Sequence, residues 1–177
     1  MTGAGKQIDS QKLFNQQKDC KDYRPGLKVI IDDIKSQDNL ASIFRVADAA
    51  GCNHIILQSD CEITKSKQFT RIARSTEKFI NLEILSKTDL FESINKYKPL
   101  VAVEITTESK NIFDSVLPAD CTFVIGNEQN GISNDLLQVC QQAIHIPMFG
   151  HNGSMNVSHA LAIALFEWRR QQVKLAY

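Results

Sequence analysis

The chain has 177 residues, of which 43% are hydrophobic and 23% are charged, and its 20 basic residues equal its 20 acidic residues in number. These values are typical of one globular domain with its own core, and they argue against global disorder and against binding of nucleic acid through net charge alone. The sequence contains no apolar run that could cross a membrane and no signal peptide at its start. We therefore expect a cytoplasmic protein that does not enter a membrane.

Short apolar runs alternate with amphipathic stretches along the chain. A polar segment over 1–27 is expected to form an arm or short helix that precedes one domain over 28–177. Strands are expected at 28–34, 54–57, 79–85, 100–106, 121–126 and 143–148, and helices at 40–50, 88–98, 132–141 and from 157 onward. This alternation predicts an α/β fold with a mostly parallel six-stranded sheet and helices on both faces.

Two of the expected helices carry further information. The helix over 40–50 has Asn39 as a candidate N-cap and Gly51 as its C-terminal stop. Arg45 falls on the face opposite the apolar stripe of this helix, where a solvated arginine is the simplest interpretation. The last helix contains "ALAIALF" (160–166), which is apolar all the way round. Since no other segment is left over to cover it, we expect a homodimer in which this helix packs against its copy.

The cysteines and histidines point to neither disulfides nor a metal site. The cysteines are odd in number and include no C-x-x-C pair; they are Cys20, Cys52, Cys61, Cys121 and Cys140. We expect buried free thiols in a reducing compartment. The histidines lack the spacing of metal ligands, so no metal is expected; they are His54, His145, His151 and His159.

Three polar stretches each follow an expected strand, at the sheet edge where parallel α/β folds bind ligands. They read "SQDNLASIFRVADAAG", "IGNEQNGIS" and "FGHNGSMNVS". Their glycines allow tight turns whose backbone groups can face a polar ligand. The chain has neither a G-x-G-x-x-G motif after its first strand nor a phosphate-binding G-x-x-x-x-G-K-[ST] loop, which argues against a dinucleotide-binding or flavodoxin-like nucleotide-binding protein.

Taken together and in this order, the three stretches resemble the motifs of the SpoU (TrmH-like) family of RNA 2′-O-methyltransferases, within the SPOUT class. The resemblance extends over about residues 28–172. The matching positions are Asn39 and Arg45 in the first stretch, Gly126 and Glu128 in the second, and Ser154, Met155 and Asn156 in the third. It implies a deep trefoil knot at the C-terminal end of the fold, an exception to the rule that chains are unknotted, with S-adenosylmethionine bound in the knot.

The resemblance also implies roles for individual residues. The catalytic candidates are Arg45, Asn39, Glu128, Ser154 and Asn156, and the cofactor-binding candidates are Gly126, Ile146, Met155, Thr106 and Met148. Because a guanidinium keeps its proton, we expect Arg45 to clamp phosphate and the developing alkoxide rather than to act as an ordinary base. From the residues alone, Asn39 and Asn156 could equally be helix caps, and Met148 could be a core residue.

The expected reaction is methylation of a ribose 2′-hydroxyl in structured RNA. The resemblance favours tRNA, because the chain is similar to the minimal tRNA members, which have no separate N-terminal RNA-binding domain. A ribosomal RNA 2′-O-methyltransferase and a non-catalytic RNA-binding dimer with the same fold remain alternatives.

RNA contact is expected at the basic segment 64–78, interpreted as a loop-like region between strands. Its candidates are Lys65, Lys67, Arg71 and Arg74, with Phe69 available to stack on a base. The alternative is an ordinary solvated face.

Overall fold

The computed structural model of the chain describes residue 9, residues 26–59 and residues 67–172. Most of the expected N-terminal arm therefore lies outside the described residues, as does Lys65. The described strands are β1 Lys28–Asp32, β2 His54–Gln58, β3 Asn81–Leu85, β4 Leu100–Val103, β5 Lys110–Asn111, β6 Thr122–Ile125 and β7 Gln142–His145. The α-helices are α2 Gln37–Ala49, α3 Lys67–Ala73, α4 Lys87–Ser93, α5 Asn134–Val139 and α6 Val157–Gln172, and the 3₁₀ helices are η1 Thr76–Lys78, η2 Ile94–Tyr97 and η3 Ile112–Asp114.

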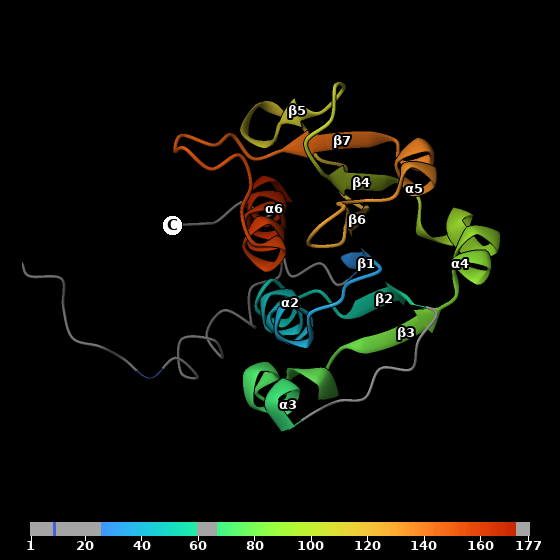
Figure 1. The fold of residues 1–177 in the computed structure, drawn as a ribbon, viewed down its shortest axis with the longest axis vertical. Coiled ribbons are helices and arrows are strands. Elements are labelled where there is room, and N and C mark those ends of the chain that lie inside the picture. The colour runs from blue at the N-terminus through green and yellow to red at the C-terminus, as the bar shows by residue number, and fades with distance from the viewer. Residues whose placement is uncertain (1–8, 10–25, 60–66, 173–177) are drawn as a thin grey trace, which may run out of the picture.

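The strands form one seven-stranded sheet in the order β3-β2-β1-β6-β4-β7-β5, and every described pair is parallel (Figure 1). The expected α/β architecture is confirmed, but the expected count of six strands is wrong by one. The additional strand, β5, has only two residues, and it pairs Lys110 with Ile144 and Asn111 with His145. Two polar residues give no hydrophobic alternation, so nothing in the sequence marks this strand.

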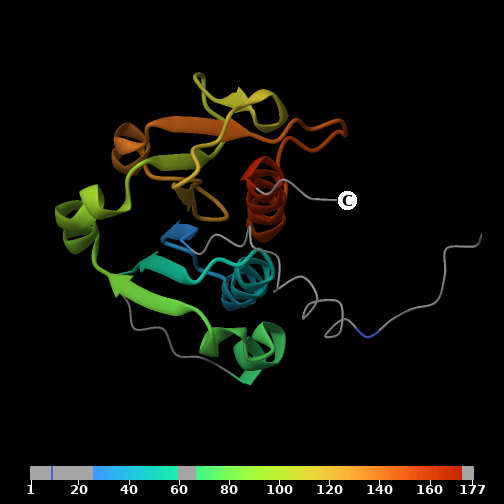
Figure 2. The same ribbon diagram turned by 180° about the vertical axis from the view of Figure 1, so that it is seen from behind.

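Helices cover both faces of the sheet (Figures 1 and 2). On one face, α2, α3 and α6 pack on alternate strand residues such as Val29 and Ile31, and the core there includes Phe44 and Trp168. On the other face, α4, η2 and α5 pack on the intervening residues, such as Ile30. Each fully buried apolar side chain of this kind stabilises the fold by roughly 1.5–3 kcal/mol.

The beginning of α2 differs from the sequence expectation. Its N-cap is Ser36, whose hydroxyl accepts a hydrogen bond of 3.3 Å from the backbone N–H of Asn39. Asn39 therefore lies inside the first turn, and the expectation that it caps the helix is wrong. Because Ser36 caps the start of the helix, the side-chain amide of Asn39 is not needed as a cap and can hydrogen-bond to other parts of the chain. The other end agrees with expectation, because Gly51 adopts a φ of 72° just after the helix.

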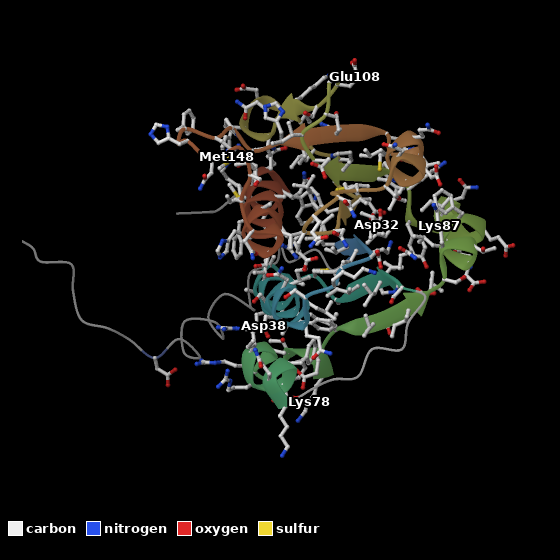
Figure 3. The ribbon with its side chains drawn as sticks, in the orientation of Figure 1. Asp32, Asp38, Lys78, Lys87, Glu108 and Met148 are labelled. Atoms are coloured by element: carbon white, nitrogen blue, oxygen red, sulfur yellow. The ribbon has the colours of Figure 1, made fainter. Side chains whose placement is uncertain are left out.

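The described part of the basic segment 64–78 is not the loop-like region that the sequence suggested. Residues 67–73 form α3, which packs against α2, and Phe69 is 1% exposed with its ring edge-on to Phe44 at a centroid distance of 5.5 Å. The expectation that Phe69 stacks on a base is therefore wrong, since its aromatic surface is used in the core. The side-chain amide of Gln68 donates to both oxygens of Asp38, at 2.7 and 2.8 Å, which joins α3 to the start of α2 (Figure 3 labels Asp38).

The last helix, α6, is covered mainly by its own chain. Its residues Leu161, Leu165 and Trp168 are buried against the sheet and α2, while Phe166 remains 52% exposed. The indole N–H of Trp168 donates to the carbonyl of Pro118, at 2.8 Å, which holds the helix against the segment after η3. No helix in the described parts of the chain is long and apolar enough to cross a membrane.

Candidate active site

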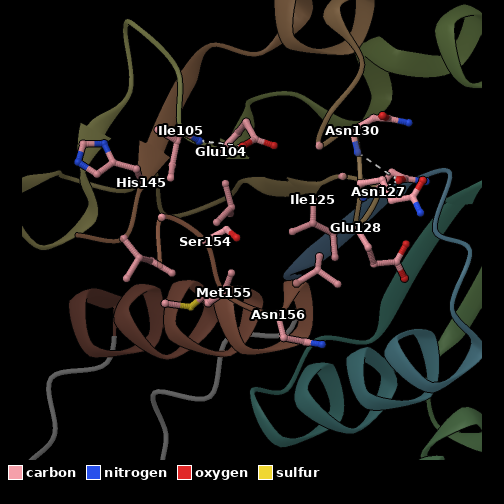
Figure 4. Close-up of a pocket in the computed structure, with 18 of the residues that line it drawn as sticks. Glu104, Ile105, Ile125, Asn127, Glu128, Asn130, His145, Ser154, Met155 and Asn156 are labelled. Carbon is pink, nitrogen blue, oxygen red and sulfur yellow. Dashed lines mark hydrogen bonds between the residues drawn. The ribbon is translucent and has the colours of Figure 1, made fainter. Parts of the chain in front are cut away.

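A cavity of about 510 Å³ lies at the carboxyl ends of β4, β6 and β7 (Figure 4). The loop before α6 and the first turn of α6 form a further wall, and Asn39 at the start of α2 lies at its margin. This volume is within the range of pockets that hold a small-molecule ligand or cofactor. The position is the one expected for a ligand in a parallel α/β sheet, because three strand ends and their loops converge there.

The loop after β6 is shaped by contacts between backbone atoms. A Cβ atom at Gly126 would lie 2.1 Å from the carbonyl carbon of Gly131 and 2.2 Å from the nitrogen of Ile132, so no side chain fits there. The turn is closed by hydrogen bonds in both directions between the backbone groups of Asn127 and Gly131, at 3.0 and 2.9 Å. The side-chain amide of Asn127 also donates to the carbonyl of Asp33, at 2.7 Å, and this ties the loop to the end of β1.

Side chains from the three polar stretches form a continuous hydrogen-bonded network beside the cavity. The amide of Asn156 donates to the side-chain oxygen of Asn39 at 2.8 Å, and the amide of Asn39 donates to Glu128 at 2.8 Å. The side-chain oxygen of Asn156 accepts from the backbone N–H of Ser158 at 2.9 Å and from its hydroxyl at 2.7 Å. Asn156 thus satisfies a free N–H at the start of α6 and orients Asn39 at the same time.

Glu128 is held in place as an ionised acceptor. Its carboxylate accepts backbone N–H groups of Lys35, at 3.2 Å, and Ser36, at 3.1 Å, in addition to the amide of Asn39. Partial burial pushes the pKa of this carboxyl upward, but hydrogen bonds from Asn39, from its own backbone and from Lys35 and Ser36 outweigh burial, so the pKa lies below its usual value. The network therefore keeps Glu128 negatively charged and unable to donate a proton.

Comparison with known proteins identifies the family of this chain. A model described as the SpoU rRNA Methylase family matches residues 26–166, which is most of the chain. The chain belongs to the SpoU family. Solved members of the family include structures with AdoMet bound, and the family is S-adenosylmethionine-dependent.

Named SpoU relatives include enzymes that act on different RNAs. The chain is 30% identical over 148 residues to the tRNA (guanosine(18)-2′-O)-methyltransferase of Aquifex aeolicus, covering 82% of this chain and 70% of that protein. It is 35% identical over 156 residues to the 23S rRNA (guanosine-2′-O-)-methyltransferase RlmB of Haemophilus influenzae, covering 83% of this chain and 61% of that protein.

Solved SpoU structures share the fold. The A. aeolicus TrmH/SpoU tRNA modifying enzyme superposes with a TM-score of 0.73 at 28% identity, covering 91% of this chain and 82% of that one. The AdoMet-bound rRNA methyltransferase of Sinorhizobium meliloti gives a TM-score of 0.77 at 25% identity, covering 89% of this chain and 60% of that one.

Most of the residues singled out by their SpoU resemblance lie at the cavity. Its lining includes Asn39, Gly126, Glu128, Ile146, Met148, Ser154, Met155 and Asn156. Arg45 and Thr106 are not part of the lining. Arg45 is exposed on α2, and the backbone N–H of Thr106 donates to the hydroxyl of Ser109 at 3.0 Å. The basic residues Lys67, Arg71 and Arg74 are exposed at α3 and just after it, away from the cavity.

Sequence reasoning assigned no site role to several polar residues of the cavity wall, among them Glu104 and His145. Glu104 follows β4 directly, and His145 ends β7, where its Nδ1 lies 3.0 Å from the hydroxyl of Ser109. The signal for Glu104 was available, because it is an acidic residue just beyond an apolar strand at the ligand-binding edge. Among the described residues, no group of three or more histidines, cysteines or carboxylates is placed to hold a metal ion.

Proposed function

We propose that this SpoU-family chain transfers a methyl group from S-adenosylmethionine to a ribose 2′-hydroxyl of structured RNA. The proposal rests on one relationship: the hydrogen-bonded network of Asn156, Asn39 and Glu128 lies at the margin of a cofactor-sized cavity. A protein that only binds RNA has no need for a cavity and an oriented polar network at one place.

The residues of the cavity suit S-adenosylmethionine. Apolar side chains that can cover an adenine ring line it together with backbone and amide groups that can bind polar atoms; the apolar members are Val103, Ile105, Ile125, Ile146, Met148, Met155, Val157 and Ala160. When bound, the cofactor supplies a methyl group on a positively charged sulfur. The tight loop at Gly126 brings backbone groups to the cavity wall, and it forms because Gly126 has no side chain to collide with the backbone of Gly131 and Ile132.

The chain's own residues would then bind and orient the ribose. We assign Asn39, Ser154 and Asn156 to positioning of the nucleotide, with Glu128 holding Asn39 in its orientation through the 2.8 Å hydrogen bond. Arg45 projects from the exposed side of the same helix that carries Asn39, and its permanent charge suits a clamp on phosphate and on the developing alkoxide. We assign Thr106, in the segment after β4, to the cofactor site on the resemblance alone, since it is not part of the cavity lining.

We further propose the knot and the dimer that the resemblance implies. The C-terminal half of α6 lies against the segment after η3, where Gln171 exchanges hydrogen bonds with Leu117 and Ser115, at 2.9 Å each, and this supports a chain end threaded past that segment.

Phe166, 52% exposed on α6, offers an apolar surface for a second copy. Sedimentation of wild type and Phe166→Glu tests the dimer, with a monomeric variant expected and a monomeric wild type contradicting it.

For the substrate we propose tRNA. Support comes from the Aquifex aeolicus tRNA enzyme, of whose length the chain covers 70%, against 61% for RlmB. Ribosomal RNA remains the second candidate, because the identity to RlmB, at 35%, is the higher of the two.

The basic side chains of Lys67, Arg71 and Arg74 form an exposed group that can contact phosphates, and Lys65 extends it in sequence. The three described cysteines are unpaired, which suits the reducing cytoplasm.

The test combines cofactor binding with methyl transfer. Calorimetric titration with S-adenosylhomocysteine should show binding, and labelled methyl from S-adenosylmethionine should then appear in unmodified tRNA rather than in 23S rRNA. Arg45→Ala should abolish transfer while binding of S-adenosylhomocysteine persists, and Lys96→Ala, an exposed cation on η2, is the matched control. A folded protein that binds RNA but no cofactor would leave the non-catalytic RNA-binding dimer as the better account.

A further inference from the structure

The charged side chains of the cavity wall share one sign. The acidic side chains among the described residues that line the cavity are Glu104 and Glu128, and no lysine or arginine is among them. The start of α6 adds partial positive charge at another wall, but Asn156 already accepts from its N–H group at Ser158. A ligand in this cavity therefore meets full negative charges without a compensating cationic side chain.

Glu104 is fixed by contacts to the segment just after β4 and to the loop between β6 and α5. One carboxylate oxygen accepts the backbone N–H of Ile105 at 2.9 Å, and the other accepts the N–H of Ile132 at 3.1 Å. Gly131 completes the arrangement, because a Cβ atom at this position would lie 2.4 Å from the second oxygen and the backbone there has a φ of 67°. The carboxylate thus takes the space that a side chain at 131 would fill.

The carboxylates of Glu128 and Glu104 differ in the number of hydrogen bonds that they accept. Glu128 accepts three hydrogen bonds from Asn39, Lys35 and Ser36, whereas Glu104 accepts two. A carboxylate has about four acceptor positions, so Glu104 retains capacity toward a ligand. Its charge also lies between β4 and the loop after β6, where the surrounding protein screens it less than water does.

We propose that Glu104 is a specificity-determining residue that makes the site prefer the positively charged cofactor over its neutral product. This inference rests on the proposed function. In methyl transfer the carbon–sulfur bond of the sulfonium breaks, a carbon–oxygen bond forms to the ribose 2′-oxygen, and the hydroxyl proton leaves to solvent. The sulfur thereby changes from a cation to a neutral thioether, and the attraction of a nearby carboxylate for it disappears. Glu104 would then strengthen binding of the methyl donor and ease release of the product.

The experiment compares ligands that differ in charge at one position. Calorimetry on wild type and Glu104→Gln would measure Kd for S-adenosylmethionine, for S-adenosylhomocysteine, and for sinefungin, which carries an ammonium group where the donor carries its sulfonium. The variant keeps the size of the side chain and removes its charge. We expect it to bind both cationic ligands about tenfold more weakly, or about 1.4 kcal/mol, with a change of less than about twofold for S-adenosylhomocysteine.

Glu104→Asp is the matched control, because it keeps the charge while withdrawing the carboxylate from Ile132. It should weaken all three ligands by a similar factor and preserve the preference for the cations. If Glu104→Gln fails to fold, Glu104→Ser, which leaves room for water at both N–H groups, replaces it. Equal weakening of all three ligands by the uncharged variant would overturn the inference and reduce Glu104 to a support for the loop, as would no change at all. Failure of wild type to bind any of the three would instead overturn the proposed function.

Discussion

The side-chain amide of Asn156 donates a 2.8 Å hydrogen bond to the side-chain oxygen of Asn39, which lies 117 positions earlier in the chain. This bond joins the start of α6 to the first turn of α2, and the next bond in the network continues to Glu128. The three polar stretches that are far apart in sequence thus act as one unit. Such a unit should respond to any one substitution as a whole.

Asn39→Ala and Asn156→Ala should each reduce the single-turnover rate of methyl transfer by about 100-fold, because either change breaks the same network, and the double variant should be little slower than either single one. Ser42→Ala is the control, since its hydroxyl only donates to the carbonyl of Asp38 within α2, at 2.8 Å. A double variant whose single-turnover rate falls by the product of the two single reductions would show that the two asparagines act independently.

Much of this network was accessible from the sequence, but its geometry was not. The motif positions Asn39, Glu128 and Asn156 were identified by resemblance, and the capping role of Asn156 was among the alternatives. What could not be read was that Ser36 would take over the cap of α2 and free Asn39, because serine and asparagine are nearly equal as N-caps. Which of the two residues caps α2 depends on Glu128, because its hydrogen bond engages the side chain of Asn39 from 89 residues away in the chain.

The structure also differs from the sequence expectation in elements whose formation depends on tertiary contacts. α3 was expected as a loop-like region, and tertiary contacts stabilise it as a helix: Phe69 and Ala73 are buried, and Gln68 donates to Asp38 of α2. The two-residue strand β5 exists only because β7 offers it an edge. Long-range contacts of this kind leave no periodic signal in either partner.

The free energy of unfolding should depend on pH through Glu128. Its pKa in the folded protein lies below the unfolded value, which is about 4.3, so its charged form stabilises the fold above that pH. Glu128→Gln should therefore be less stable than wild type at neutral pH, and the difference should shrink as the pH falls below about 4. Denaturant titrations across this range measure it. Glu108→Gln, a change at an exposed carboxylate that projects from the edge of the molecule, should show no such trend (Figure 3).

Gly126→Ala should abolish cofactor binding and destabilise the protein by more than about 2 kcal/mol, because its Cβ would overlap the backbone at Gly131 and Ile132. Thermal unfolding and titration with S-adenosylhomocysteine report the two effects. Gly150→Ala is the matched control, since a Cβ there meets no atom within 4 Å. Normal binding by Gly126→Ala would mean that the loop after β6 can open without cost.

Charge reversal on α3 should weaken RNA binding. Arg71→Glu should lower affinity for tRNA and reduce the dependence of log K on log salt by about one for each phosphate that the protein no longer neutralises. Filter binding over a series of salt concentrations gives both quantities. Lys96→Glu, on η2 and also exposed, should have little effect. Equal reductions in affinity for the two variants would indicate a general effect of net charge rather than RNA binding at α3.

The described thiols should resist alkylation in the native protein. Burial raises the pKa of Cys52 and of Cys140 to about 11 and that of Cys121 to about 12, so almost no thiolate is present at neutral pH. Mass spectrometry after iodoacetamide treatment should find these positions unmodified until guanidinium unfolds the chain. Rapid modification of native Cys121 would show that the segment before β6 opens readily.

The place of α6 in the chain has a consequence for biosynthesis. Its first turn and the loop before it supply a wall of the cavity and the Asn156 bond to Asn39, yet they leave the ribosome after all seven strands. A nascent chain that has already paired its sheet therefore still lacks part of the cavity that we propose binds the cofactor. Affinity for cofactor would appear only once α6 has docked, so it would distinguish chains that have completed folding from those stalled or truncated before residue 157.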